Sequence, residues 1–333
     1  MRIISANKQR MSLDSENRNI VLLSGLAIII FVVMGFLNPK TFLSRTNLQG
    51  MCVQFAEFGI LSYGMMLAMI SGGIDLSLVG IANLTGIICS LVIKSMGGST
   101  TSILLGMAAG LLVGIVCGTI NGFFIGYFQI PPMLVTLSGL QLYTGISLAI
   151  TKGPAITGLP ESFSQISNGK IYEIPYSLII FTLITIVLCY LLKSTVYGRH
   201  VYFMGTNPVA SRYSGINNLK ITMMTYCLSG ILGSVAGILM ASRYNSAKSD
   251  YGTSYTLLTL LICVLGGISP SGGRGKVLGV TLSILVLQLL SSALNIMRVN
   301  SFIKTFIWGL MLIGIMAVTW LIEKYKSKKA GEK

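Results

Sequence analysis

Polar side chains occur inside stretches of this chain that are otherwise apolar. Amides and acids there could bind a solute through hydrogen bonds or carry protons, because an ionisable group in an apolar surrounding is usually functional. The alternative is that a lone amide only joins neighbouring helices. Because no basic residue lies deep in such a stretch, the set suits a neutral polyhydroxylated solute better than an anion. The candidates for a translocation path or gate are Glu57, Gly72, Gly73, Asp75, Ser77, Asn83, Asn121 and Gln141, with Gln54, Tyr143 and Gln288 as further polar residues.

Other chemistry is disfavoured by the residues available for it. The chain has one histidine, His200, and no nucleophile–base pair or metal-ligand spacing accompanies it. The stretch Gly273-Arg274-Gly275-Lys276 lacks the upstream glycine of a phosphate-binding loop and is followed by Val277. We therefore predict no catalytic residue, no metal and no bound cofactor. If the protein works with ATP as its energy source, a separate partner ATPase must use the ATP-Mg. The six cysteines read as buried small hydrophobes: Cys52, Cys89, Cys117, Cys189, Cys227 and Cys263.

Two glycine-rich segments interrupt the apolar pattern, at 71–77 and 266–276. Both contain Gly-Gly-Ile-x-x-Ser, which suggests a repeat. Irregular backbone at membrane depth occurs only where protein or a water-filled cavity satisfies its amides, so the breaks point to a solute route. They are equally explained as glycine-rich cytoplasmic turns. Placing the Asp75 carboxylate at membrane depth would cost about 2.5–3.5 kcal/mol, which indicates a functional role. At the membrane interface the same side chain could instead cap the helix that follows.

The elements that position these residues are predicted from composition and apolar length. Of 333 residues 53% are hydrophobic and 10% charged, and the net charge is +15. An ordinary soluble enzyme or a disordered chain is excluded, and an all-α polytopic membrane protein is predicted. The third and eighth of its ten spans are short. The spans are Ile20–Leu37, Leu48–Ile70, Leu78–Ile93, Ile103–Tyr127, Met133–Ile150, Tyr176–Leu192, Ile221–Ala241, Tyr255–Gly267, Val277–Leu294 and Phe302–Leu321.

The basic residues give this layout a direction. Their heaviest clusters fall on one side of ten crossings, which places the N- and C-termini in the cytoplasm and makes nucleic-acid binding a poor explanation of the charge. The expected organisation is a cytoplasmic tail at 1–19, a membrane domain at 20–321 and a basic cytoplasmic tail at 322–333. Within the membrane domain, loop 193–220 is cytoplasmic and loop 151–175 is extracytoplasmic.

Loop 193–220 contains the start and stop signals of a short helix. Asn207 is suited to the N-cap, Pro208 to the first turn and Gly215 to the position after the end. A helix of about two turns does not hold itself in water. It either rests on the membrane face of its own protein or docks a cytoplasmic subunit.

Three stretches together resemble the permease subunits of bacterial ABC importers of the ribose, galactose, rhamnose and autoinducer type. They are Met69–Ser77, the segment from Tyr197 through Asn207-Pro208 to Ile216, and Gly266–Gly275. The resemblance implies a multi-pass protein of the bacterial inner membrane and three kinds of partner: an ABC ATP-binding subunit, a second permease copy or paralogue, and an extracytoplasmic sugar-binding protein. The residues it implies for coupling to the ATPase are Gly198, Arg199, Gly205, Asn207, Pro208, Ala210 and Gly215.

The function expected on this basis is that of an ATP-driven permease for a sugar or sugar-like solute, without an ATPase site of its own. The rival hypothesis is a secondary transporter driven by an ion gradient. In that case Glu57 and Asp75 would serve as proton or cation sites.

Overall fold

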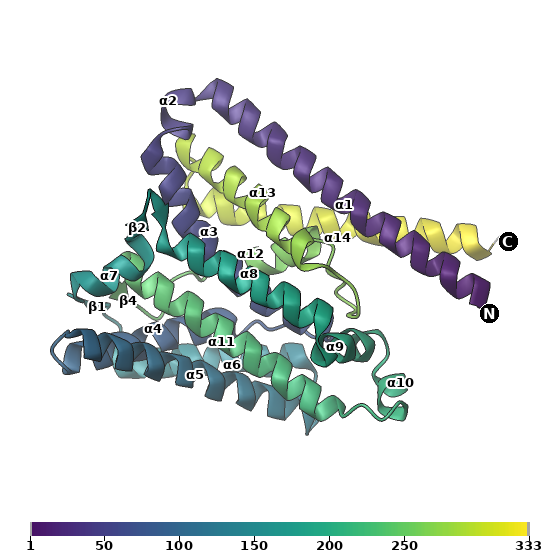
Figure 1. Cartoon of the computed structure of the whole chain (residues 1–333), viewed down its shortest axis with the longest axis horizontal. Coiled ribbons are helices and arrows are strands. Elements are labelled where there is room, and N and C mark those ends of the chain that lie inside the picture. The colour runs from purple at the N-terminus through teal and green to yellow at the C-terminus, as the bar shows by residue number, and fades with distance from the viewer. Residues whose placement is uncertain (1, 332–333) are drawn as a thin grey trace.

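The computed structural model describes residues 2–331, and these form a bundle of helices (Figure 1). Each of the ten predicted spans corresponds to a helix. Among the described residues, eight helices are long and apolar enough to cross a membrane, whereas α12 and the apolar part of α14 are shorter. The helices are α1 (Arg2–Leu37), α2 (Pro39–Phe42), α3 (Arg45–Ile70), α4 (Leu78–Ser95), α5 (Thr100–Gly126), α6 (Pro132–Thr151), α7 (Glu161–Asn168), α8 (Tyr176–Ser194), α9 (Val196–Thr206), α10 (Pro208–Tyr213), α11 (Asn218–Tyr244), α12 (Tyr255–Leu265), α13 (Val277–Ile296) and α14 (Ser301–Gly331).

Helix α3 forms the centre of the bundle. Of its most apolar window 89% is buried, whereas only 17% is buried in the window within Asn19–Leu37 of α1 and 22% in those of α6 and α8. The exposed faces carry large apolar side chains such as Phe36, Leu183 and Leu142. A helix that is apolar all round and exposed outward is suited to contact lipid.

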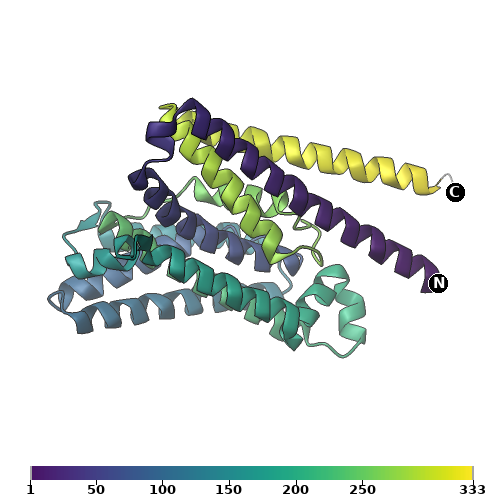
Figure 2. The same ribbon diagram turned by 45° about the horizontal axis from the view of Figure 1, so that its top comes forward.

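The two ends of the bundle differ in structure. At one end, β1 (Ile156–Thr157) pairs antiparallel with β4 (Ser246–Ala247), and β2 (Lys170–Ile171) pairs with β3 (Ile174–Pro175). At the other end lie α9 and α10, and both ends of the chain extend in the same direction (Figures 1 and 2). The strands and α7 belong to the predicted extracytoplasmic side, and α10 to the predicted cytoplasmic loop.

Helix α5 packs closely on its neighbours because it carries a glycine at every fourth position. A Cβ at Gly118 would overlap the carbonyl oxygen of Tyr226 in α11 and lie 3.1 Å from the Cα atoms of Cys227 and Gly230. Small residues at four-residue spacing let two helix backbones approach each other in a membrane. The stripe consists of Gly106 and Gly110 against α4, and of Gly114, Gly118, Gly122 and Gly126 against α11.

The short span α12 follows an irregular segment, 248–254, that leaves the β1–β4 pair and enters the bundle. Ser249 is buried, and the Asn83 amide of α4 donates a hydrogen bond of 2.9 Å to its carbonyl oxygen. A buried backbone carbonyl without a partner would be costly. Asn83 therefore has a structural role: it satisfies a backbone carbonyl of a third non-helical segment inside the bundle. This segment is not marked by a glycine cluster in the sequence.

Candidate functional site

The predicted short helix is present as α10, with Pro208 at its first position. The Asn207 side chain accepts hydrogen bonds from the backbone N–H groups of Val209 and Ala210, both at 3.0 Å. Gly215 follows the helix with φ +79°, a conformation that favours glycine. The caps read from the sequence are therefore those that form.

Helix α10 is held against its own protein on one side only. The amide of Asn218, at the start of α11, donates to the carbonyl of Pro208 (2.8 Å), and Ser211 donates to the Asn218 side chain (2.8 Å). On the other side Val209 is 64% exposed and Tyr213 is 90% exposed. A cavity of about 730 Å³ borders this helix and includes Arg212 among its lining residues. An apolar and an aromatic side chain standing free beside a groove are typical of a contact surface.

Helix α9 connects α10 to the bundle. Gly198 lies in the first turn of α9, where a Cβ would overlap the carbonyl oxygen of Leu192 in α8. Tyr197 is buried and its hydroxyl lies 2.9 Å from Thr225 of α11; burial raises its pKa to about 12. Arg199 is exposed on the same helix. Of the two residues of α9 predicted for coupling near its start, Gly198 allows the close contact with α8, and Arg199 is available to a partner.

Both glycine breaks and the end of α9 meet at one place, which we call the glycine junction: Ile70–Gly73, Gly205–Thr206 and Gly272–Gly273. The N–H of Gly273 donates to the carbonyl of Ile70 at 2.9 Å. A Cβ at Gly205 would overlap that carbonyl and lie 2.6 Å from the Gly273 nitrogen. A Cβ at Gly272 would lie 2.7 Å from the Gly205 carbonyl oxygen. Three backbones touch here without side chains between them, so the end of α9 is in direct backbone contact with the end of α3.

The two breaks share one local structure. After α3, the N–H groups of Gly72 and Gly73 donate to Met69 and Ala68; after α12, those of Gly267 and Ile268 donate to Val264 and Cys263. Both are the Schellman ending of a helix, with a left-handed glycine after the cap. The left-handed residue is Gly72 (φ +92°) in one break and Gly267 (φ +81°) in the other. The repeated caps are therefore offset by one residue from the repeated Gly-Gly-Ile letters.

Asp75 lies in the first break and is fully buried in a hydrogen-bond network. Its Oδ1 accepts from the backbone N–H (3.1 Å) and hydroxyl (2.5 Å) of Ser77, and its Oδ2 accepts from Ser229 of α11 (2.6 Å). The network continues as Asn121 of α5 donates to Ser77 (2.8 Å) and Tyr143 of α6 donates to Asn121 (2.8 Å). Asp75 thus fixes the turn before α4 and joins it to α5, α6 and α11.

The position of Asp75 bears on the two interpretations of the break. Ser229 lies eleven residues after the first residue of α11, so about 16 Å of helix rise separates this level from the start of α11. Asp75 is thus deeper in the bundle than the start of α11, whereas Ser71, at the start of the same break, borders the cavity beside α10. The polar groups of Asp75 are satisfied by protein, as a non-helical segment inside a membrane requires.

Glu57 is distant from this network and forms an ion pair. Its Oε2 lies 2.8 Å from Nη1 of Arg243, in the last turn of α11, and Glu57 is fully buried. The Arg243 guanidinium also stacks on the Tyr244 ring at 5.1 Å. Arg243 lies outside the span predicted to end at Ala241; the sequence signal for it is a basic residue in the last turn of a helix.

The residues predicted for the translocation path do not all lie in one place. Gly72, Gly73, Asp75, Ser77 and Asn121 lie together near the glycine junction, whereas Glu57 and Asn83 serve other contacts and Gln141 is exposed on α6. All six cysteines are free thiols.

Comparison with known proteins gives the class of this chain. The profile of the family described as "Branched-chain amino acid transport system / permease component" matches residues 47–316. The chain therefore belongs to this family of transport permeases, and it is a multi-pass membrane protein and a transport subunit. No solved structure gives a significant match.

Three relatives cover nearly the whole chain. The ribose import permease protein of Bacillus subtilis (strain 168) is 33% identical over 326 residues, 97% of this chain and 98% of that protein. The L-arabinose transport system permease protein of Escherichia coli (strain K12) is 30% identical over 300 residues, 90% and 89% of the two chains. The L-arabinose ABC transporter permease protein of Azospirillum brasilense is 28% identical over 305 residues, 91% and 88%. The resemblance inferred from the three sequence stretches is confirmed.

Proposed function

We propose that this chain is the permease subunit of an ATP-driven importer for a monosaccharide, located in the bacterial inner membrane with α10 and both termini in the cytoplasm. The observation that carries the proposal is the glycine junction, because it joins the exposed helix α10 to the central span α3. The relatives named for ribose and L-arabinose support a sugar as the solute. The clustering of basic residues at the α10 end supports the orientation.

The energy source is a separate ATP-binding subunit that uses ATP-Mg. Val209, Arg212 and Tyr213 on α10 form its docking surface, with Arg199 beside them. An extracytoplasmic binding protein delivers the solute to the opposite end, and a second permease copy or paralogue completes the pathway. These partners follow from the relatives' importer class and from the absence of a phosphate-binding loop in this sequence.

The coupling step follows from the contacts. Closure of the ATP-binding subunits moves α10, and Asn207 transmits that movement to α9 because it caps α10 and ends α9. Gly205 then presses on the carbonyl of Ile70 and on Gly273, which shifts the end of α3 relative to α4. The Asp75 network keeps the shifted turn attached to α11. Movement is thus converted into opening and closing of the bundle.

Removal of the exposed α10 side chains tests the docking surface. A chain carrying both Val209→Asp and Tyr213→Ala should retain about a tenth or less of the ATP-binding subunit on co-purification, because buried aromatic anchors contribute about 2 kcal/mol or more to an interface. Its thermal stability alone should stay unchanged, since both side chains are exposed. Tyr172→Ala is the matched control, because Tyr172 is 95% exposed at the opposite end. Equal recovery of the subunit with both variants would refute docking at α10.

A further inference from the structure

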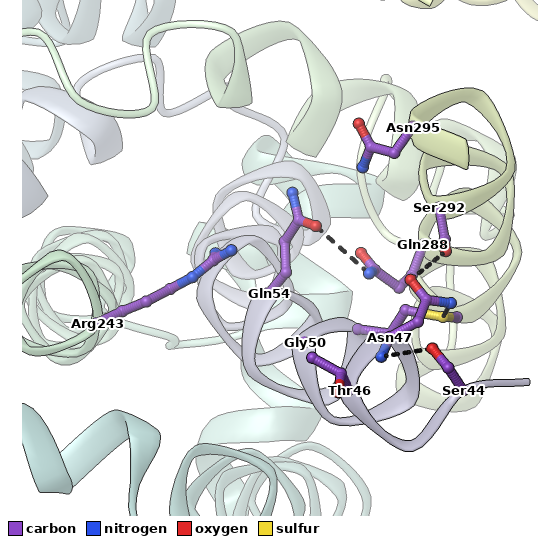
Figure 3. Close-up of a pocket in the computed structure, with 10 residues that line it drawn as sticks. Ser44, Thr46, Asn47, Gly50, Gln54, Arg243, Gln288, Ser292 and Asn295 are labelled. Carbon is purple, nitrogen blue, oxygen red and sulfur yellow. Dashed lines mark hydrogen bonds between the residues drawn. The ribbon is translucent and has the colours of Figure 1, made fainter. Parts of the chain in front are cut away.

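A polar cavity opens at the end of the bundle opposite α10, between α3, α13 and the end of α11 (Figure 3). Its volume is about 360 Å³, at the lower end of the range of small-molecule sites, about 300–1,000 Å³. Exposed residues Thr46, Gly50 and Asn295 lie at its mouth, and Gln288, only 2% exposed, lies at its floor. The cavity therefore suits one small solute that enters from the predicted extracytoplasmic side.

The polar lining follows helical spacing on two facing helices. Asn47, Gly50 and Gln54 occupy positions i, i+3 and i+7 of α3, and Gln288, Ser292 and Asn295 occupy i, i+4 and i+7 of α13. Ser292 donates to Asn47 (3.2 Å), and the amides of Gln288 and Gln54 meet only at 3.5 Å. Figure 3 shows these two glutamines directed toward each other, with Arg243 pointing at them from α11. Packing of the helix core does not require a stripe of amides on each wall of a cavity. The arrangement instead indicates that the two walls bind something polar between them.

The hydrogen-bonding capacity of this lining is not used up within the described part of the chain. The Oε1 atom of Gln288 is buried and has no donor there. A buried amide oxygen without a partner is costly and calls for an explanation. Each lining amide carries both donors and acceptors, as a sugar hydroxyl does, so a bound sugar would satisfy both kinds of group.

The charge of the cavity also selects the solute. Arg243 is the only charged residue among those that line it, and Glu57 behind the wall neutralises that charge at 2.8 Å. An anion would find only Arg243, already paired with Glu57, and Lys304, whose ammonium donates to Asn295 at the mouth, and the ammonium group of an amino acid would find no acid in the lining. A neutral polyhydroxylated molecule needs neither.

Below the two glutamines the same helix pair is closed. A Cβ at Gly59 of α3 would lie 3.4 Å from Ile284 of α13, and the Tyr63 hydroxyl lies 2.8 Å from Thr281. Phe58 and Leu61 of α3 are buried at this level. The cavity is thus a blind pocket with a sealed floor, which is the geometry of a site reached from one side.

We infer that this cavity is a solute site of the permease itself, in which Gln54 and Gln288 bind the hydroxyl groups of one neutral monosaccharide. This inference rests on the proposed function and adds to it the place where the permease holds its cargo. Arg243, held by Glu57, is a positioning residue that supplies further N–H donors at the wall.

Uptake of labelled D-ribose, L-arabinose and L-leucine by the complete importer in proteoliposomes tests the site. Gln288→Leu removes the floor amide, and Gly50→Leu fills the mouth, where a Cβ meets no atom within 4 Å and the fold should tolerate it. Each should lower pentose uptake about tenfold or more, as loss of one or two hydrogen bonds and of the space itself requires. Gln49→Leu, on the same helix but bonded to Glu173 and Lys170 outside the cavity, should keep at least half of the uptake.

A direct measurement separates binding from a folding defect. A Gly50→Cys variant in a Cys52→Ala background should react with a membrane-impermeant maleimide, and millimolar pentose should slow that reaction whereas leucine should not. Full uptake in both leucine variants, or labelling that no pentose slows, would overturn the site. Failure of the unaltered complex to transport either pentose would contradict the proposed function itself, and the sugar assignment of the cavity with it.

Discussion

Replacing Gly205 by alanine should separate ATP hydrolysis from transport. A Cβ at this position overlaps the Ile70 carbonyl and disrupts the hydrogen bond from Gly273, two changes that together cost about 2–4 kcal/mol. Coupling free energies between sites are about 1–3 kcal/mol. The free-energy cost of the substitution is therefore as large as the coupling free energy itself. We expect solute transported per ATP hydrolysed to fall about tenfold or more in proteoliposomes.

The control for this prediction is alanine at a glycine in open space. Gly145 lies within α6, and a Cβ there meets no atom within 4 Å. Gly145→Ala should therefore leave coupling intact and stabilise the helix by about 0.5–1 kcal/mol. Transport by the Gly205→Ala importer at the same ratio to hydrolysis as the unaltered one would show that the glycine junction does not carry the coupling.

A leucine at Gly118 should destabilise the bundle. The new side chain would have to enter the contact between α5 and α11, where the Tyr226 carbonyl and the Cα atoms of Cys227 and Gly230 already fill the space. Overpacking of this kind costs about 3 kcal/mol or more when backbone is the obstacle. We expect a fall of about 6–12 °C in the melting temperature of the detergent-solubilised protein, with a matching loss from the membrane.

Gly145→Leu provides the comparison, because it adds the same side chain to an exposed helical position. It should be recovered in normal amount with an unchanged or higher melting temperature. If the Gly118→Leu and Gly145→Leu variants had the same melting temperature, the glycine stripe of α5 would not be the contact that holds α5 to α11.

Local sequence signals predicted the helices and short-range caps well. Each apolar stretch became a helix, and the Asn207-Pro208 start and the Gly215 stop of α10 form as expected, because spans and caps depend on neighbouring residues. The offset between the two Schellman caps shows the limit of such signals. The letters Gly-Gly-Ile repeat, but the residue that must be left-handed is set by where each helix ends.

Long-range contacts were beyond prediction from a single sequence. The meeting of Gly72, Gly205 and Gly272 joins segments far apart in the chain, and no local pattern indicates it. The pairing of Glu57 with Arg243 likewise depends on α3 and α11 lying side by side. The four-residue glycine spacing of α5 was present as a signal, and it predicts close helix contacts even without knowledge of the partner helix.

The most direct test of the account is uptake of labelled D-ribose and L-arabinose into proteoliposomes that contain the permease, its ATP-binding subunit and its binding protein. The account predicts uptake that requires enclosed ATP-Mg and the binding protein and that persists when ionophores remove proton and sodium gradients. Accumulation of the sugar by the permease alone, driven by such a gradient without ATP, would contradict it and would establish a secondary transporter.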